Sequence, residues 1–248
     1  MLIKPFRIKQ HNIHYEGDYA EREMEWRRIC AQDKVNNLQA LLKDSDIETI
    51  LEVGCGTGAV LAEVARRGIG SQHVGVDMAD PSEHADPDSH ELTLIQYNGK
   101  SLPFDDESFD LVYASHVVEH VPDPRGFISE LSRVAKKAIY IEVPLELHIR
   151  STQKALQRTV DIGHINPYSL ESFLLLLQTA ELDVQDIQIF DHSLDVHQFH
   201  TSPIKGSIKK TIRGTLLSFN QILASRLFTY HCGALSRPRL AVSVASID

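Results

Sequence analysis

The sequence predicts an α/β fold: a doubly wound, mostly parallel sheet with helices on both faces. Apolar segments typical of buried strands alternate with helical segments through the middle of the chain, and this alternation is typical of parallel sheets. The stretch Ile50–Leu61 also runs from an apolar strand through three glycines into a helix, which is the strand–turn–helix unit of such folds.

Right-handed crossovers bring the carboxyl ends of parallel strands to one edge of the sheet, where ligands bind. The expected strands are 49–53, 72–77, 92–96, 109–114, 137–143 and 184–190, and helices are expected at 18–42, 59–67, 124–135 and 169–180. Several residues fall at or just past strand ends and are expected to meet at that edge: Gly54, Asp77, Asn98, Ser115 and Pro144.

The glycine-rich turn after the first strand is a candidate ligand loop. Glycine lets the backbone turn sharply and approach a bound molecule, and the following helix start offers free N–H groups. Glu52 precedes Gly54, Gly56 and Gly58, and its carboxylate suits an ammonium group better than a pyrophosphate. Because Gly54, Gly56 and Ala59 also satisfy a looser dinucleotide fingerprint, an NAD(P)-dependent oxidoreductase stays an alternative.

This motif resembles that of the class I S-adenosylmethionine-dependent methyltransferases, in particular a bacterial subgroup of the type 11 methyltransferases. Their acid-x-Gly-x-Gly-x-Gly pattern matches 52–58, and a second long motif matches 102–124. The resemblance covers roughly residues 45–180. It implies a Rossmann-like, seven-stranded sheet with an antiparallel last strand, and S-adenosyl-L-methionine as the cofactor.

In this family the loop wraps the methionine part of the cofactor, and an acid ending the second strand, here Asp77, binds the ribose. An Asp usually contacts the adenine amino group; Asn98 takes its place here, and its side-chain oxygen can accept the same hydrogen bond. The cofactor-binding residues implied by the resemblance are Glu52, Gly54, Cys55, Gly56, Gly58, Asp77, Met78, Asn98, Gly99 and Ser115.

The resemblance implies methyl transfer to a small-molecule acceptor, which we expect to be a hydroxyl group of a metabolite, saccharide or lipid-linked compound. A hydroxyl acceptor needs a base, and histidine suits that role at neutral pH. His164 is the first candidate because it lies where substrate loops lie, and His116 and His120 are the alternatives. A non-catalytic cofactor-binding protein is a further alternative.

Other polar and aromatic residues are candidates for contacting the acceptor. Tyr19 and Trp26 belong to an N-terminal segment that either packs on the core or closes over the site as a lid. The candidate substrate-binding residues are Tyr19, Trp26, Glu142, Glu146, Asn166 and Tyr168.

The expected organisation is an arm and lid helix at 1–46, a core at 47–190 and 236–248, and a helical insertion at 191–235. Leu240–Val244 is the expected seventh strand, about fifty residues after the sixth, far beyond an ordinary hairpin loop. Within the insertion, 207–230 has an amphipathic helical pattern, which predicts a packed helix, a substrate cap, a dimer contact or a peripheral membrane contact.

The composition limits the classes of molecule and metal that the protein is expected to bind. The 248 residues carry a formal net charge of -9, which argues against a nucleic-acid partner. Three scattered cysteines are too few for a disulfide framework or a zinc site. We expect no metal site; the weak alternative is the trio His192, His197 and His200. The sequence shows no signal-peptide pattern and no apolar stretch of bilayer length, so a cytoplasmic protein is expected.

Overall fold

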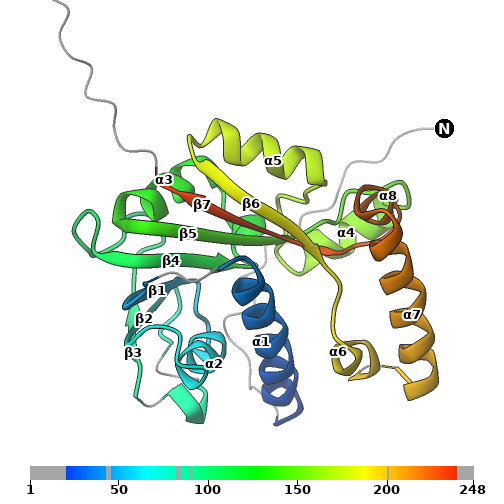
Figure 1. The fold of residues 1–248 in the computed structure, drawn as a ribbon, viewed down its shortest axis with the longest axis horizontal. Coiled ribbons are helices and arrows are strands. Elements are labelled where there is room, and N and C mark those ends of the chain that lie inside the picture. The colour runs from blue at the N-terminus through cyan, green and yellow to red at the C-terminus, as the bar shows by residue number, and fades with distance from the viewer. Residues whose placement is uncertain (1–20, 43–45, 82–84, 90, 200, 239–248) are drawn as a thin grey trace, which may run out of the picture.

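The computed structural model describes residues 21–42, 46–81, 85–89, 91–199 and 201–238, and these form a single seven-stranded sheet (Figure 1). The strand order is β3-β2-β1-β4-β5-β7-β6. β7 runs antiparallel to both of its neighbours, and the other described pairs are parallel. The strands are β1 (Thr49–Val53), β2 (Gln72–Asp77), β3 (Thr93–Gln96), β4 (Phe109–Ser115), β5 (Ala135–Pro144), β6 (Asp183–Phe190) and β7 (His231–Arg237).

The sheet confirms the expected fold class, but the seventh strand lies earlier in the chain than expected. β7 occupies His231–Arg237, whereas the expected 240–244 lies outside the described residues. The strand is hard to recognise from the sequence because four of its seven residues are small: Cys232, Gly233, Ala234 and Ser236. A Cβ at Gly233 would come within 2.6 Å of the Tyr140 hydroxyl, so the tight packing between β5 and β6 excludes a bulky side chain there.

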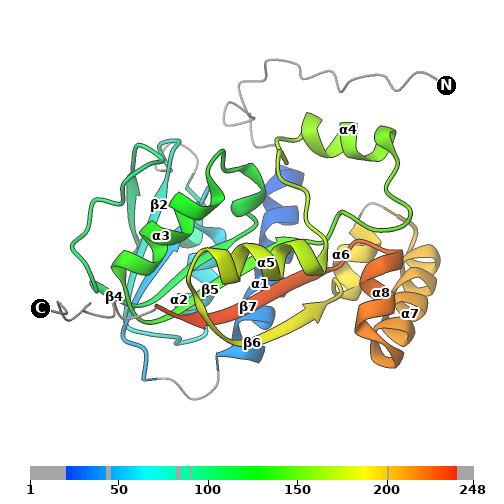
Figure 2. The same ribbon diagram turned by 90° about the horizontal axis from the view of Figure 1, so that it is seen from above.

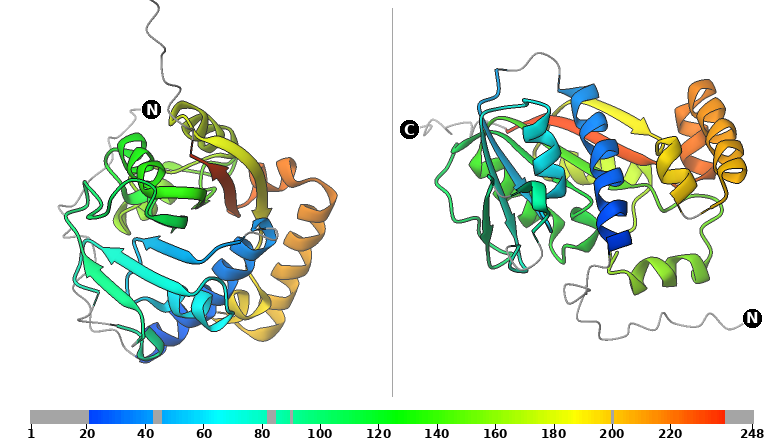
Figure 3. Two further views of the ribbon diagram at one scale, coloured as in Figure 1. Left: turned by 60° about the vertical axis from the view of Figure 1, so that its left-hand side comes forward. Right: turned by 90° about the horizontal axis from the view of Figure 1, so that it is seen from below.

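Helices cover both faces of the sheet (Figure 2). α3 and α5 lie on one face, and α1 and α2 lie on the other, which comes forward in the right-hand view of Figure 3. The helices are α1 (Glu21–Leu41), α2 (Ala59–Arg66), α3 (Pro124–Val134), α4 (Gln153–Asp161), α5 (Leu170–Thr179), α6 (Leu194–Phe199), α7 (Pro203–Phe219) and α8 (Gln221–Leu227), with short 3-10 turns at Pro87–Ser89 and Val118–His120.

Each face of the sheet has its own hydrophobic core, because successive strand residues point to opposite sides. In β1, Ile50 packs in the cluster that contains Leu38 of α1, whereas Leu51 packs with Ile128 of α3 and Phe173 of α5. All five side chains are buried, and each such burial stabilises the fold by roughly 1.5–3 kcal/mol. The central strands are therefore covered on both faces, and ligands reach them at the edges.

The chain between β6 and β7 leaves and re-enters the sheet at its carboxyl edge, because His231 pairs with both Phe190 and Pro144. This segment folds into α6, α7 and α8, which stand beside the end of the sheet (Figure 1). Ile212 and Phe219 of α7 are exposed, whereas Leu216 packs against the core, so the expected apolar stripe is divided. A dimer or membrane contact through 207–230 stays a prediction. Among the described helices, none has the length and apolar character needed to span a bilayer.

Candidate functional site

The loop between β1 and α2 forms an open cradle at the carboxyl edge of the sheet. Gly54, Gly56 and Gly58 all have positive φ angles, 81°, 52° and 79°, which explains why glycine is needed at each. A Cβ at Gly54 would overlap the Val117 side chain, so that side of the loop is closely packed. At Gly56 a Cβ would meet only Arg27 Nη1 at 3.9 Å, so that side is open to a ligand.

Two buried polar groups beside this loop lack partners within the described part of the chain. They are Oε2 of Glu52 and the hydroxyl of Ser115. Burial raises the pKa of Glu52 to about 8. Buried polar atoms are nearly always hydrogen-bonded in native proteins, so we expect a bound ligand to supply the partners of these two groups. An ammonium group would pair with the Glu52 carboxylate, and the methionine part of S-adenosylmethionine carries one.

The ends of β2 and β3 complete the expected cofactor site. The Asp77 carboxylate accepts hydrogen bonds from the N–H of Gly56 at 2.8 Å and of Ala79 at 3.1 Å. Oδ1 of Asn98 accepts the N–H groups of Lys100 at 2.8 Å and Ser101 at 3.0 Å. The Asn98 oxygen is therefore engaged in shaping its own turn, and its expected contact with adenine would have to compete with these bonds.

Cys55, Met78 and Gly99 contribute shape. The Cys55 thiol is buried against Gly75, and burial raises its pKa, so the thiol stays neutral and turned toward the sheet. Met78 is more than half exposed, and its side chain packs beside Gly99, where a Cβ would come within 2.7 Å of the Met78 sulfur.

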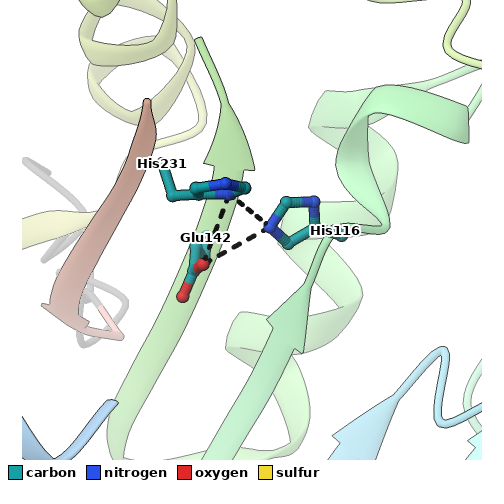
Figure 4. A group of neighbouring side chains, drawn as sticks. All are labelled: His116, Glu142 and His231. Atoms are coloured by element: carbon teal, nitrogen blue, oxygen red, sulfur yellow. Dashed lines mark hydrogen bonds and ion pairs between the residues drawn. The ribbon is translucent and has the colours of Figure 1, made fainter. Parts of the chain in front are cut away.

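Three histidines form a continuous chain of contacts: His116 follows β4, His231 begins β7, and His192 follows β6. Figure 4 shows His116 and His231 with Glu142. Nε2 of His116 lies 2.8 Å from Nδ1 of His231, and Nε2 of His231 lies 2.8 Å from Nε2 of His192. Glu142 of β5 faces the first of these contacts, with Oε1 3.4 Å from His116 Nε2. His116 has a φ of 62°, a conformation that is rare outside glycine and that turns the chain sharply after β4.

Carboxylates hold both ends of this histidine chain. Nδ1 of His116 lies 3.4 Å from Oε1 of Glu119, and Nδ1 of His192 lies 3.5 Å from Oδ2 of Asp33. Burial and the neighbouring rings lower the pKa of His231 well below its ordinary value. Burial also disfavours a charged His116, but the facing carboxylates outweigh that effect and raise its pKa.

A second polar group lies on the other side of Glu119. Nδ1 of His164 lies 2.9 Å from Oε2 of Glu146, and the His164 ring meets the His120 ring edge-on with centroids 4.7 Å apart. Burial lowers the pKa of His120. His116, His120 and His164, the three histidines predicted from the sequence, therefore surround one buried carboxylate, that of Glu119.

The remaining predicted substrate residues lie in different settings. Asn166 donates to the carbonyl of Val121 at 2.7 Å and its N–H donates to the carbonyl of Glu119, so it braces the turn that carries His120. Tyr168 is buried in the core against Phe173 rather than in a substrate loop, because its ring extends the apolar cluster under α5. Burial accordingly raises its pKa to about 12.

The N-terminal residues are only partly described. Trp26 packs on Phe199 of the insertion, with ring centroids 5.1 Å apart, which connects α1 to α6. Tyr19 lies outside the described residues, as does His200 of the alternative metal trio. The other two members of that trio face different carboxylates, since His192 faces Asp33 and His197 faces Asp191.

Sequence reasoning missed His231 and Asp33, and it grouped His192 with His197 and His200 rather than with these two residues. No local signal identifies them, because His231 lies 115 residues from its contact His116 and meets it only through pairing of β5 with β7. Glu119 and Glu142 could have been grouped with His116 from their positions at the ends of β4 and β5.

Two cavities lie at opposite edges of the sheet. One of about 390 Å³ adjoins the histidine chain through His192 and is lined by Arg150, Lys209, Arg213 and Phe228, among others. The larger cavity, about 720 Å³, is lined by Lys136 and other residues at the amino-terminal end of β5, away from the glycine loop. Of these two cavities, the first adjoins the histidine chain.

Comparisons with known proteins agree with this geometry. Residues 51–141 match a family model described as a methyltransferase domain. An uncharacterized methyltransferase of Mycobacterium sp. (strain JLS) is 43% identical over 90 residues, which are 36% of this chain and 34% of that protein. A probable chloroplastic tocopherol O-methyltransferase of Oryza sativa subsp. japonica is 27% identical over 240 residues, covering 84% of this chain and 66% of that protein.

A solved structure extends the similarity to the whole fold. Geranyl diphosphate C-methyltransferase from Streptomyces coelicolor A3(2), in complex with Mg²⁺, geranyl diphosphate and S-adenosyl-L-homocysteine, aligns with a TM-score of 0.61. The identity is 15%, and the alignment covers 90% of this chain and 85% of that one. At this identity the similarity concerns the fold. The chain spans only about a third of the length of the Mycobacterium relative that it matches.

Proposed function

Because the chain belongs to the class I S-adenosylmethionine-dependent methyltransferases, we propose that it transfers a methyl group to an oxygen atom of a small-molecule acceptor. The observation that carries the proposal is the packing of Val117 against Gly54. Val117 follows His116 directly and lies in the same turn as His120, so the histidine-bearing turn contacts the glycine loop. A donor in the loop and an acceptor beside the histidines would therefore be neighbours.

The residues around the loop fit the cofactor. Glu52 offers its buried Oε2, which lacks a hydrogen bond, to the ammonium group; Gly56 leaves open space; and Asp77 ends β2 where the ribose would bind. When bound, S-adenosylmethionine supplies an electrophilic methyl group. Alignment of the two reactants then supplies a large part of the catalysis, up to ~7–11 kcal/mol in ideal cases.

His164 is the proposed base for the acceptor hydroxyl. When its Nδ1–H donates to Glu146, the tautomer is fixed and the lone pair on Nε2 is free to take a proton. A positioned base of this kind contributes typically ~10²–10⁴ in rate. His116 and His120 stay alternatives for this role.

The cavity beside His192 supports a finer proposal about the acceptor. Arg150, Lys209 and Arg213 bring three basic side chains to its lining, and Phe228 adds an apolar surface. Asp191 neutralises Arg213, with 2.7 Å between Oδ1 and Nε. The cationic excess would attract an acceptor that carries an anionic group next to an apolar part.

The test is incubation of the full-length chain with a cell extract and methyl-labelled S-adenosylmethionine, followed by fractionation of the products. We expect label in a small molecule that is retained on an anion-exchange column. A labelled but unretained product would refute the anionic acceptor and leave the methyltransferase proposal intact. Binding of S-adenosylhomocysteine without label in any fraction would favour the non-catalytic alternative, and tight binding of NAD instead would favour the oxidoreductase.

The proposed compartment is a reducing cytoplasm. Cys30, Cys55 and Cys232 form no disulfide within the described part of the chain, and disulfides are rare in reducing compartments.

A further inference from the structure

His116, Glu142 and His231 point their polar atoms toward a common space at the carboxyl edge of the sheet (Figure 4). We propose that these three side chains bind a divalent transition-metal ion. The inference departs from the sequence-based expectation of no metal site. It does not depend on the proposed function, because metal binding can be measured without cofactor or acceptor.

The spacing of the three atoms fits one coordination sphere. Nε2 of His116 lies 2.8 Å from Nδ1 of His231, and Oε1 of Glu142 lies 3.4 Å from the first and 3.8 Å from the second. Ligands that are each about 2.1 Å from one ion are separated by about 3.0 Å at right angles and about 3.4 Å at tetrahedral angles. The observed separations scatter around these values, so small side-chain rotations would complete the site.

Hydrogen-bond accounting gives a second, independent argument. The chain Glu119–His116–His231–His192–Asp33 has four contacts, but three neutral imidazoles supply only three N–H groups. If the end rings donate to the carboxylates and His231 donates to His192, then two nitrogen lone pairs face each other at 2.8 Å between His116 and His231.

An ion bound between His116 and His231 removes this conflict. Both lone pairs would then bind the metal, and the three N–H groups would serve the three remaining contacts. The rings stay neutral, which is the form that ligates metals. Two arrangements compete with the ion: a fourth proton on the chain, or a His116 that donates its Nε2–H to His231 and leaves Glu119 without a hydrogen bond. Either would exclude an ion from the same place.

The charge at the cluster also favours a cation. Glu119 and Glu142 are 0% and 1% exposed, so two carboxylates are removed from water beside the rings. Oε1 of Glu119 faces Nδ1 of His116 at 3.4 Å, but neither oxygen of Glu119 makes a hydrogen bond to a residue that the structure describes. Buried carboxylates are destabilising unless they are paired, and a dication between these side chains would add to the compensation that the nearby Lys34 provides.

Outer groups hold each proposed ligand in place, as they do in established metal sites. Glu119 faces His116, and His192 faces His231. The carboxylate of Glu142 accepts the hydroxyl of Tyr140 at 2.5 Å and the amide of Asn37 at 3.2 Å. These partners come from elements far apart in the sequence, so the arrangement depends on the complete fold.

The ligand set indicates the type of ion. Imidazole nitrogen suits Zn²⁺, Fe²⁺, Co²⁺ and Ni²⁺, whereas Mg²⁺ and Ca²⁺ prefer an all-oxygen environment. Two histidines and one carboxylate also leave coordination positions open to water or to an oxygen atom of another molecule.

The test is titration of the chelator-treated, full-length protein with Co²⁺ and, separately, Zn²⁺. We expect one equivalent of Co²⁺ to bind with a visible absorption band, Zn²⁺ to displace it, and Zn²⁺ to raise the melting temperature. Glu142→Gln keeps nearly the same shape and should weaken binding at least tenfold. Asp33→Asn, at the end of the histidine chain, should weaken it by about 10–100-fold.

His164→Gln is the matched control, because His164 belongs to the neighbouring cluster with Glu119 and His120. It should bind Co²⁺ like the wild type. Two results would overturn the proposal: a folded wild-type protein that binds no stoichiometric ion, or a site that is lost in His164→Gln and kept in Glu142→Gln. The first of these results needs only the titration of the wild-type protein. The proposal can therefore be tested even if a variant fails to fold.

Discussion

The Asp77 carboxylate accepts the backbone N–H of Gly56 at 2.8 Å, which ties the end of β2 to the middle of the glycine loop. The residue expected to bind the ribose thus also fixes the loop expected to hold the methionine part. One carboxylate can serve both purposes, because it has four lone-pair positions and the structure uses two of them for N–H groups.

Asp77→Ala should therefore weaken S-adenosylhomocysteine binding by more than a lost ribose contact. Charge-assisted hydrogen bonds contribute about 1.5–3 kcal/mol, and the loop would lose its tie as well. Asp77→Asn is the matched variant, since it can keep an acceptor oxygen toward Gly56 but loses the charge. Calorimetry should rank wild type above Asn and Asn above Ala; unchanged affinity in both variants would remove Asp77 from the site.

Gly54→Ala should mainly lower the stability of the fold, whereas Gly56→Ala should mainly lower the affinity for the cofactor. Both place a side chain at positive φ, which costs about 1–2 kcal/mol, but only the Gly54 Cβ would overlap Val117. Gly54→Ala should therefore melt several degrees below Gly56→Ala. Gly56→Ala should stay folded and lose cofactor affinity, because its Cβ points into the open cradle. Normal affinity in Gly56→Ala would mean that the loop is only a structural corner.

His164→Ala should lower methyl transfer by ~10²–10⁴ and leave cofactor affinity nearly intact, because the base acts on the acceptor. Glu146→Gln should lower it less, since the ring stays and only its orientation is loosened. His73→Ala is the control, because His73 lies in β2 and contacts the carbonyl of Ile69, away from the carboxyl edge. A fully active His164→Ala would transfer the role to His116 or His120.

Glu52 should make the stability of the cofactor-free protein depend on pH. Burial raises its pKa from 4.5 to about 8, so the folded state favours the protonated acid. The stabilisation that the protonated Glu52 gives is complete below pH 4.5 and is lost as the pH rises toward 8. At about 1.4 kcal/mol per pKa unit, the loss in the free energy of unfolding is up to about 5 kcal/mol.

Urea denaturation of wild type and Glu52→Gln from pH 5 to pH 8 measures this effect. The Gln variant should show a flatter profile and be the more stable protein at pH 8, yet bind S-adenosylhomocysteine more weakly because the ammonium loses its counter-ion. Parallel pH profiles for the two proteins would show that Glu52 is ionised and satisfied in the fold.

Trp26, the single tryptophan of the chain, should report on the lid. It packs on Phe199, and its neighbour Arg27 extends to within 3.9 Å of a Cβ position at Gly56. Addition of S-adenosylhomocysteine should change the tryptophan fluorescence in a saturable way. Asp77→Ala should shift the fluorescence titration to higher ligand concentration. If the fluorescence stays unchanged at a concentration that calorimetry shows to be saturating, α1 does not contact the cofactor site.

The sequence by itself determined the fold class, six of the seven strands and the edge of the sheet where a ligand is expected. These features depend on local patterns: apolar strands of four to seven residues, glycines at positive φ, and polar residues directly after strand ends. The expected positions of β1 and β2 match the structure residue for residue. The candidate cofactor loop could be identified for the same reason, since Glu52 to Gly58 is one continuous segment.

Tertiary structure alone decided the last strand and the histidine chain. β7 carries small residues because Tyr140 fills the space beside Gly233, so its sequence lacks the alternation of large apolar residues that identifies a strand. That strand brings His231 to His116 across 115 residues. Side chains so distant meet only when hydrogen bonds between strands fix the register, and no local propensity encodes that pairing.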